Sequence, residues 1–333
     1  MLFNFFVILT SFLVGFAMKR GGLCTYTAVL QIVHENRLER MMVFLGASAW
    51  ATLVILPLSW LLPNYFELSL THHQLSIAIL GGMILGIGSF INKGCFFGTF
   101  VQLVSGNLNY IVTLLGLSAG IIITQRYFDH LIPTNLTMTE VNSPTPNAYI
   151  WLIGMSIFAL FMVFSIKMRG DGIIKKLTGL CTMSWQSSFA MIVIGIGGGL
   201  LYVTVNGWNY ADVLANITKK LSGTQTDGPS NTALISTMSM MLGGIIAAVT
   251  AKEFAIKPVR LIMIVSCFLG GLLMGSAALL TPGGNDGLLL KDIPSFAPHA
   301  LIGYSAMVIM MWVLVALFRN KALSKEKYKY SDQ

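Results

Sequence analysis

The chain has 333 residues, of which 55% are hydrophobic and only 10% are charged, and its formal net charge is +8. A soluble globular domain carries about 25% charged residues, so this composition excludes a soluble core. A basic protein can bind nucleic acid, but the basic residues here form no continuous stripe, so we expect no nucleic-acid partner.

Nine apolar runs dominate the chain, each of about 20 residues, the length that crosses the hydrocarbon core of a bilayer as a helix. They lie near residues 2–18, 40–62, 75–92, 108–125, 147–168, 187–205, 230–251, 259–280 and 298–318. The runs are continuously apolar rather than alternating, which excludes a membrane β-barrel. We therefore predict an all-α polytopic membrane protein with about nine transmembrane helices.

The first run is not a cleavable signal peptide, because its basic residues, Lys19 and Arg20, follow the apolar stretch instead of preceding it. If the N-terminus lies outside, most of the remaining basic residues fall in the cytoplasmic loops and the C-terminal tail. The other side then holds only Arg126, Lys219, Lys220 and Lys291. This bias obeys the positive-inside rule and predicts a multi-pass chain with a cytoplasmic C-terminus, in contact with membrane lipid.

Two pairs of segments resemble each other. GGMILGIGSFINKGCFFG at 81–98 shares five glycine positions with GGLLMGSAALLTPGGNDG at 270–287, and Cys95 then aligns with Gly284. A weaker match aligns GFAMKRGGLCTYT with GLLYVTVNGWNYA, and Cys24 with Trp208. Because both matches occur in the same order, they predict two repeats, and the odd span between them makes these repeats inverted.

This comparison divides the chain into four parts. Residues 1–126 form the first repeat with spans 1–4, and residues 127–180 form a connecting fifth span and a cytoplasmic loop. Residues 181–318 form the second, inverted repeat with spans 6–9, and residues 319–333 form a basic cytoplasmic tail.

Glycine-rich breaks interrupt the apolar helices at Gly22 and Gly94. About ten residues follow each break, which is too few to cross the bilayer again, so we predict short re-entrant half-helices whose N-termini point into the protein. Such N-termini expose N–H groups and a positive dipole end, which suit an anion. Arg20 and Lys93 would add positive charge, or would extend to the cytoplasmic interface.

The four cysteines fall into two classes. Cys24 and Cys95 follow glycine at the first turn of a half-helix, whereas Cys181 and Cys267 are interpreted as small buried hydrophobes. A thiolate would repel an anionic substrate, so we predict neutral S–H donors at Cys24 and Cys95. No spacing or motif indicates a metal ion, a cofactor or a catalytic group, so we expect a protein that is not an enzyme.

GFAMKRGGLCTYTAV and GGMILGIGSFINKGCFFGT resemble the two N-terminal signature segments of the YeeE/YedE family of sulfur transport proteins in the bacterial inner membrane. The resemblance covers nearly the whole chain. It implies an inverted-repeat fold that carries thiosulfate inward past central cysteines, and it assigns the first two of these to Cys24 and Cys95. The third belongs where this chain has Gly284, followed by Asn285 and Asp286. The resemblance therefore implies thiosulfate, or another small sulfur or selenium species, as the substrate.

Several alternatives stay open at this point. Asp286 is expected to cap its half-helix, but as a protonated group it would couple transport to protons. A membrane thiol-redox protein would use Cys24 and Cys95 as an exchanging pair. A sulfur-relay protein would hand sulfur to a soluble carrier protein docked on the basic tail, although attraction to the membrane surface explains this tail equally well.

Overall fold

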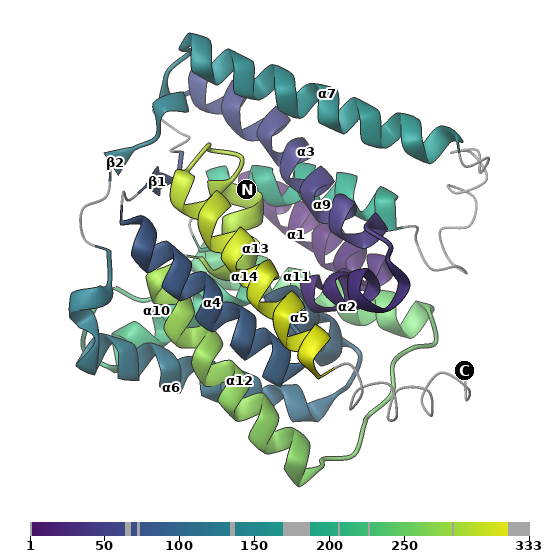
Figure 1. Cartoon of the computed structure of the whole chain (residues 1–333), viewed down its shortest axis with the longest axis vertical. Coiled ribbons are helices and arrows are strands. Elements are labelled where there is room, and N and C mark those ends of the chain that lie inside the picture. Colours follow the sequence, from purple (N-terminus) through teal and green to yellow (C-terminus); the bar gives the residue numbers. More distant parts are fainter. Residues whose placement is uncertain are drawn as a thin grey trace.

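The computed structural model describes residues 2–63, 68–71, 74–133, 137–168, 187–205, 207–225, 227–281 and 283–318 (Figure 1). The loop predicted to be cytoplasmic, Cys181 and the basic tail lie outside this description. The elements of the first half are α1 (Leu2–Gly21), α2 (Thr25–Glu35), α3 (Glu39–Leu61), β1 (Leu70–Thr71), α4 (Leu75–Asn92), α5 (Phe96–Val104), η1 (Leu108–Tyr110) and α6 (Ile111–Tyr127). Those that follow are η2 (Asp129–Leu131), β2 (Thr137–Met138), η3 (Glu140–Asn142), α7 (Pro146–Met168), α9 (Ser187–Thr204), α10 (Tyr210–Leu221), α11 (Asn231–Thr250), α12 (Leu261–Leu280), α13 (Gly284–Gly287), η4 (Leu288–Asp292) and α14 (Pro298–Leu317).

Long apolar helices occupy all nine predicted runs. In the described part of the chain, eight helical stretches are long and apolar enough to cross a membrane, and α9 is a further, shorter apolar helix. Only β1 and β2 are strands among the described residues, and they form a two-residue antiparallel pair. The predicted fold class, an all-α polytopic membrane protein, is confirmed.

Short helices follow the breaks, as predicted. The segments α2, α5 and α10 have 11, 9 and 12 residues, and α13 has only four before the chain continues as the π-helix η4. Gly22 and Gly207 have φ angles of +55° and +65°, a left-handed conformation that a β-carbon disfavours. These glycines end α1 and α9 and turn the chain into α2 and α10.

The helices pack in a pattern that repeats when the two predicted halves are exchanged. Helix α1 packs on α11 as α9 packs on α3, and α4 packs on α14 as α12 packs on α6. The half-helix α2 contacts α14 in the same way that α10 contacts α6. The division into two repeats stays a prediction. Two repeats of this kind would produce the helix packing described here.

Helices α4 and α12 cross at the middle of this arrangement, and glycine permits their close approach. A β-carbon on Gly88 would lie 2.9 Å from the carbonyl oxygen of Gly270, and one on Gly270 would lie 2.7 Å from the backbone nitrogen of Asn92. Small residues at such crossings let membrane helices pack backbone to backbone. The breaks that follow α4 and α12 are thereby held close together.

Helix α7 is the span that connects the two predicted repeats. It packs on α3 and lies along one edge of the molecule, where Figure 1 shows it outside the other long helices. Only 17% of its apolar window is buried within the protein. This helix therefore contributes little to the centre where the half-helices meet.

Candidate functional site

The two predicted thiols meet at the centre of the molecule. Cys24 Sγ and Cys95 Sγ lie 3.8 Å apart, and the backbone N–H of Thr25 donates to Cys95 Sγ at 3.3 Å. Both side chains are buried, with exposed fractions of 7% and 0%. Gly98 leaves room for this pair, because a β-carbon there would lie 2.5 Å from Cys24 Sγ. Two S–H groups thus converge at adjoining half-helix N-termini.

Asn285 connects the second half of the chain to these thiols. Its Oδ1 accepts a hydrogen bond from the backbone N–H of Phe96 at 3.1 Å, and its Nδ2 donates to Thr25 Oγ1 at 3.4 Å. Thr25 and Phe96 are the residues that follow Cys24 and Cys95. One fully buried amide therefore touches the first turn of both thiol-bearing half-helices.

The caps of the half-helices refine the comparison between the repeats. Cys24 is the N-cap of α2 and Cys95 that of α5, whereas Asn209 caps α10 and accepts the N–H of Asp212 at 2.8 Å. The left-handed Gly22 and Gly207 each lie two residues before a cap. By this criterion Asn209 in the second half corresponds to Cys24 in the first. The sequence match had instead aligned Cys24 with Trp208, one residue earlier.

Asp286 is buried beside this centre, and it does not cap its helix as expected. The N-cap of α13 is Gly283, which has no side chain to offer, and Asp286 lies within the first turn. Gly283 and Gly284 have φ angles of +86° and +63°, so the chain passes through two left-handed residues where α13 begins at Gly284. Asp286 Oδ1 has no hydrogen-bond partner among the described residues.

Gly284, where the resemblance implied a third cysteine, packs against an aromatic ring. A β-carbon added to it would lie 2.6 Å from Phe96 Cε2. Gly94 behaves differently, because its nearest neighbours would be at 3.4 Å or more, and Gly22 faces open space. Of the glycines predicted for the site, only Gly284 is thus confined by a side chain from the other repeat.

The predicted cations lie farther out. Arg20 Nη2 donates to Thr250 Oγ1 at 2.8 Å, and its guanidinium group lies 5.5 Å from the centre of the Phe16 ring. Lys93 is exposed at the end of α4, in a left-handed conformation with φ of +57°. Arg20 thus contacts α1 and α11, and Lys93 lies at the protein surface. Their role in offsetting substrate charge stays a prediction.

Two polar groups at the centre had been missed. The Asn92 side chain donates to the carbonyl oxygen of Gly94 at 2.8 Å and to Thr99 Oγ1 at 2.9 Å, which fixes the turn before Cys95. The Tyr210 hydroxyl donates to the carbonyl oxygen of Phe96 at 2.7 Å. The signal for Asn92 was present in the sequence, since an amide at the end of an apolar helix needs buried partners.

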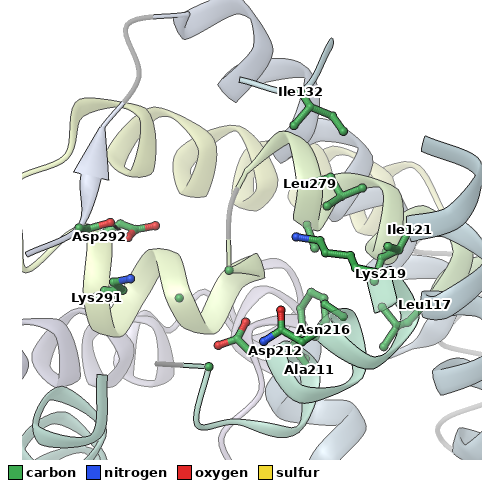
Figure 2. A pocket seen from close by; sticks show the side chains of 18 of the residues that line it. Leu117, Ile121, Ile132, Ala211, Asp212, Asn216, Lys219, Leu279, Lys291 and Asp292 are labelled. Carbon is green, nitrogen blue, oxygen red and sulfur yellow. Dashed lines mark hydrogen bonds between the residues drawn. The ribbon is translucent and has the colours of Figure 1, made fainter. Parts of the chain in front are cut away.

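A cavity of about 300 Å³ adjoins this centre. Its walls include Phe96 at the start of α5, Gly207 before α10, and Gly283 and Gly287 at the two ends of α13. Figure 2 shows Lys219 and Lys291 on opposite sides of the cavity, with Asp212 and Asn216 between them. The cavity therefore connects two lysines to the residue that follows Cys95.

Replacing Asn285 by leucine should lower the free energy of unfolding by about 1–3 kcal/mol, because the buried N–H of Phe96 would lose its acceptor. Thermal unfolding of the purified protein in detergent measures the effect. Asn216→Leu is the matched control, since Asn216 lines the cavity and makes no side-chain hydrogen bond among the described residues. Equal stability of the two variants would contradict the structural role of Asn285.

Metal binding finds no support in this region. Across the described ranges, no group of three or more His, Cys, Asp or Glu side chains could hold a metal ion. The chemistry that the centre offers is hydrogen-bond donation from thiols, amides and backbone N–H groups, in a setting from which water is largely excluded.

Comparison with known proteins agrees with these features. A family model described as sulphur transport matches residues 20–313. The chain is also similar to the thiosulfate transporter TsuA of Spirochaeta thermophila, with 22% identity over 340 residues that cover 94% of this chain and 98% of that protein. The range matched by the family model includes Cys24, Cys95, Asn285 and Asp286.

Proposed function

The chain belongs to the sulphur transport family, as its two glycine–cysteine segments predicted, and we propose that it imports thiosulfate, or a closely related sulfur or selenium anion, across the bacterial inner membrane. In this proposal the chain moves its substrate without converting it chemically and needs no cofactor. The N-terminus lies outside, the C-terminus lies in the cytoplasm, and the two repeats are inverted relative to each other.

The thiol pair is the observation that carries this proposal. Cys24 and Cys95 lie at the N-termini of α2 and α5, so their S–H groups and the first backbone N–H groups of both helices point toward one place. Helix N-termini attract anions, and S–H groups are weak donors that suit a soft sulfur acceptor. The hydrogen bonds that now join Thr25 to Cys95 and Phe96 to Asn285 would open to receive the anion.

The cavity supports a path to this place from the outside. Lys219 and Lys291, two of the few basic residues assigned to the outer side, line it, and neither has an ion-pair partner within the described ranges. A volume of about 300 Å³ holds a small anion with part of its hydration shell, since one water occupies about 30 Å³ of the liquid. Phe96, which lines the cavity, directly follows Cys95 in the chain.

An uptake assay tests the proposal. A bacterial strain that depends on thiosulfate, with its sulfate uptake removed, should grow when it expresses this chain and should accumulate labelled thiosulfate. The matched control is the Cys24→Ala/Cys95→Ala double variant at the same membrane abundance, which should support neither. Failure of the wild-type chain to support growth or accumulation would overturn the thiosulfate assignment.

A thiol-redox function is the second candidate, because two free thiols lie 3.8 Å apart in a buried site. In this function Cys24 and Cys95 would reduce a disulfide substrate to two thiols by thiol–disulfide exchange, form a disulfide with each other, and be reduced again by a dithiol donor. The two candidates differ in one measurement. Oxidation of the pair to a disulfide should stop thiosulfate uptake if the S–H groups bind the substrate. If the protein instead works by thiol–disulfide exchange, the oxidised pair should retain its redox activity.

The sulfur-carrier alternative depends on the basic tail, which lies outside the described residues. Deletion of residues 321–333 should leave uptake intact if transport needs no soluble partner. A large loss of uptake, with normal membrane abundance, would instead favour a carrier protein docked on the tail.

A further inference from the structure

Asp286 is a buried carboxyl group that the proposed anion binding does not use. Only 6% of the residue is exposed, and its Oδ1 has no hydrogen-bond partner among the described residues. Within the same part of the chain, no lysine, arginine or histidine lies within ion-pair distance of it. Carboxylates inside membrane proteins normally pair with a cation or face water. Among the described residues, the backbone N–H groups of Asp286 and Gly287 offset part of the charge here, but no cation does.

The groups around Asp286 increase this difficulty. Those that face it are mostly acidic or neutral: Cys95 on α5, Tyr202 on α9, and Asp212 and Tyr210 on α10. The adjoining η4 carries Lys291 and Asp292, and the only titratable residue of α12 is Cys267. Asp292 is itself engaged, because it accepts a hydrogen bond from Ser69 and lies 3.7 Å from His299 Nε2. These surroundings therefore favour the protonated, neutral form of Asp286 over the ionised form.

An anion at the thiols would make an ionised Asp286 more unfavourable still. Asn285 touches the first turns of both thiol-bearing half-helices, so the residue next to it lies close to any anion bound there. Two like charges repel strongly where water is excluded. Anion and proton should therefore bind together, each increasing the affinity for the other, since such coupling is reciprocal.

We propose, on the basis of the proposed transport function, that Asp286 binds a proton together with each anion and makes the chain a proton-coupled importer. The proton reaches Asp286 from the cavity, which touches Gly283 and Gly287 on either side of it in the chain. It leaves with the anion on the cytoplasmic side. A dianion thereby crosses the hydrophobic centre with one negative charge compensated.

Calorimetry on the purified protein tests the coupling directly. Thiosulfate binding is measured at one pH in two buffers that differ in ionisation enthalpy, and the difference in heat gives the protons taken up per anion. At a pH high enough to ionise Asp286 in the free protein, we expect about one proton per anion for the wild-type chain, as linkage between one anion and one carboxyl requires. Asp286→Asn, which is neutral at every pH, should bind thiosulfate without proton uptake.

Asp227→Asn is the matched control, because Asp227 is an exposed carboxyl that does not line the cavity. It should take up protons like the wild type. Retained proton uptake in Asp286→Asn, or its loss in Asp227→Asn, would overturn the assignment to Asp286. The wild-type measurement stands even if a variant fails to fold. Thiosulfate binding without a proton overturns the coupling alone, whereas no thiosulfate binding contradicts both proposals.

Transport provides the second measurement. In proteoliposomes with the membrane potential held at zero, a gradient of one pH unit, acid outside, should raise wild-type accumulation about tenfold per coupled proton. Asp286→Asn should equilibrate thiosulfate without responding to the gradient. Accumulation by the wild type that is independent of the gradient would contradict the proposal.

Discussion

Replacement of Cys95 by alanine should lower thiosulfate uptake by about ten- to a hundredfold, the effect of losing one or two hydrogen bonds to a charged group. Cys95 is fully buried, contacts Cys24 Sγ and accepts the N–H of Thr25, so alanine removes the thiol without opening a path for water. Uptake of labelled thiosulfate per unit of folded transporter measures the effect. Cys24→Ala should follow the same direction.

Two further variants make this test specific. Cys267→Ala is the control, because Cys267 is a buried thiol in α12 and should leave uptake unchanged. Cys95→Ser keeps a hydrogen-bond donor and should retain part of the uptake if the thiol acts as a donor. Complete loss in the serine variant would point to a covalent role for sulfur, and normal uptake in Cys95→Ala would refute any role in transport.

Introducing a third cysteine at position 284, where the resemblance implied one, should lower the stability and the transport activity of this protein. In Gly284→Cys the new β-carbon would lie 2.6 Å from Phe96 Cε2, and its residue would have to hold a φ angle of +63°. A non-glycine residue in such a conformation costs about 1–3 kcal/mol, and the ring contact adds to this. We expect a lower unfolding temperature in detergent and reduced uptake.

The two contributions can be separated. Gly223→Cys is the matched control, since Gly223 has a φ of +74° but meets nothing within 4 Å, so it carries the backbone strain without the contact. The Gly284→Cys/Phe96→Ala double variant should recover part of the loss by removing the ring. Gly284→Cys with wild-type stability and faster uptake would show that the site accepts a third thiol.

The sequence was sufficient for the architecture of the membrane spans. Apolar runs and glycine breaks predicted the long helices to within a few residues, because the hydrocarbon core dictates both their length and their composition. It also placed Cys24 and Cys95 at the beginnings of half-helices, since a helix that resumes after a glycine break exposes its first residues. These features depend on local composition, which a sequence displays directly.

The contacts of the site could not be predicted in the same way. The hydrogen bond between Asn285 and Phe96 joins residues that are 189 positions apart, and nothing local encodes it. The expected cap at Asp286 was wrong because α13 begins at Gly284, with the left-handed Gly283 as its N-cap, so Asp286 lies inside the helix. The exposure of Lys93 similarly depends on how its helix end is turned, which tertiary packing decides.

The caps of the half-helices have a consequence for mutational tolerance. The helix packing is nearly the same when the two halves of the chain are exchanged, but the N-cap residues of the half-helices differ. Cysteines are the N-cap residues of α2 and α5, whereas an asparagine amide caps α10 and a glycine is the N-cap of α13. A saturation library selected for growth on thiosulfate should therefore accept few residues at Cys24 and Cys95, where a thiol is required. At Asn209 the surviving residues should be those whose side chains can cap α10, and at Gly283 those that tolerate a φ angle of +86°. The two halves of the chain should therefore tolerate different substitutions.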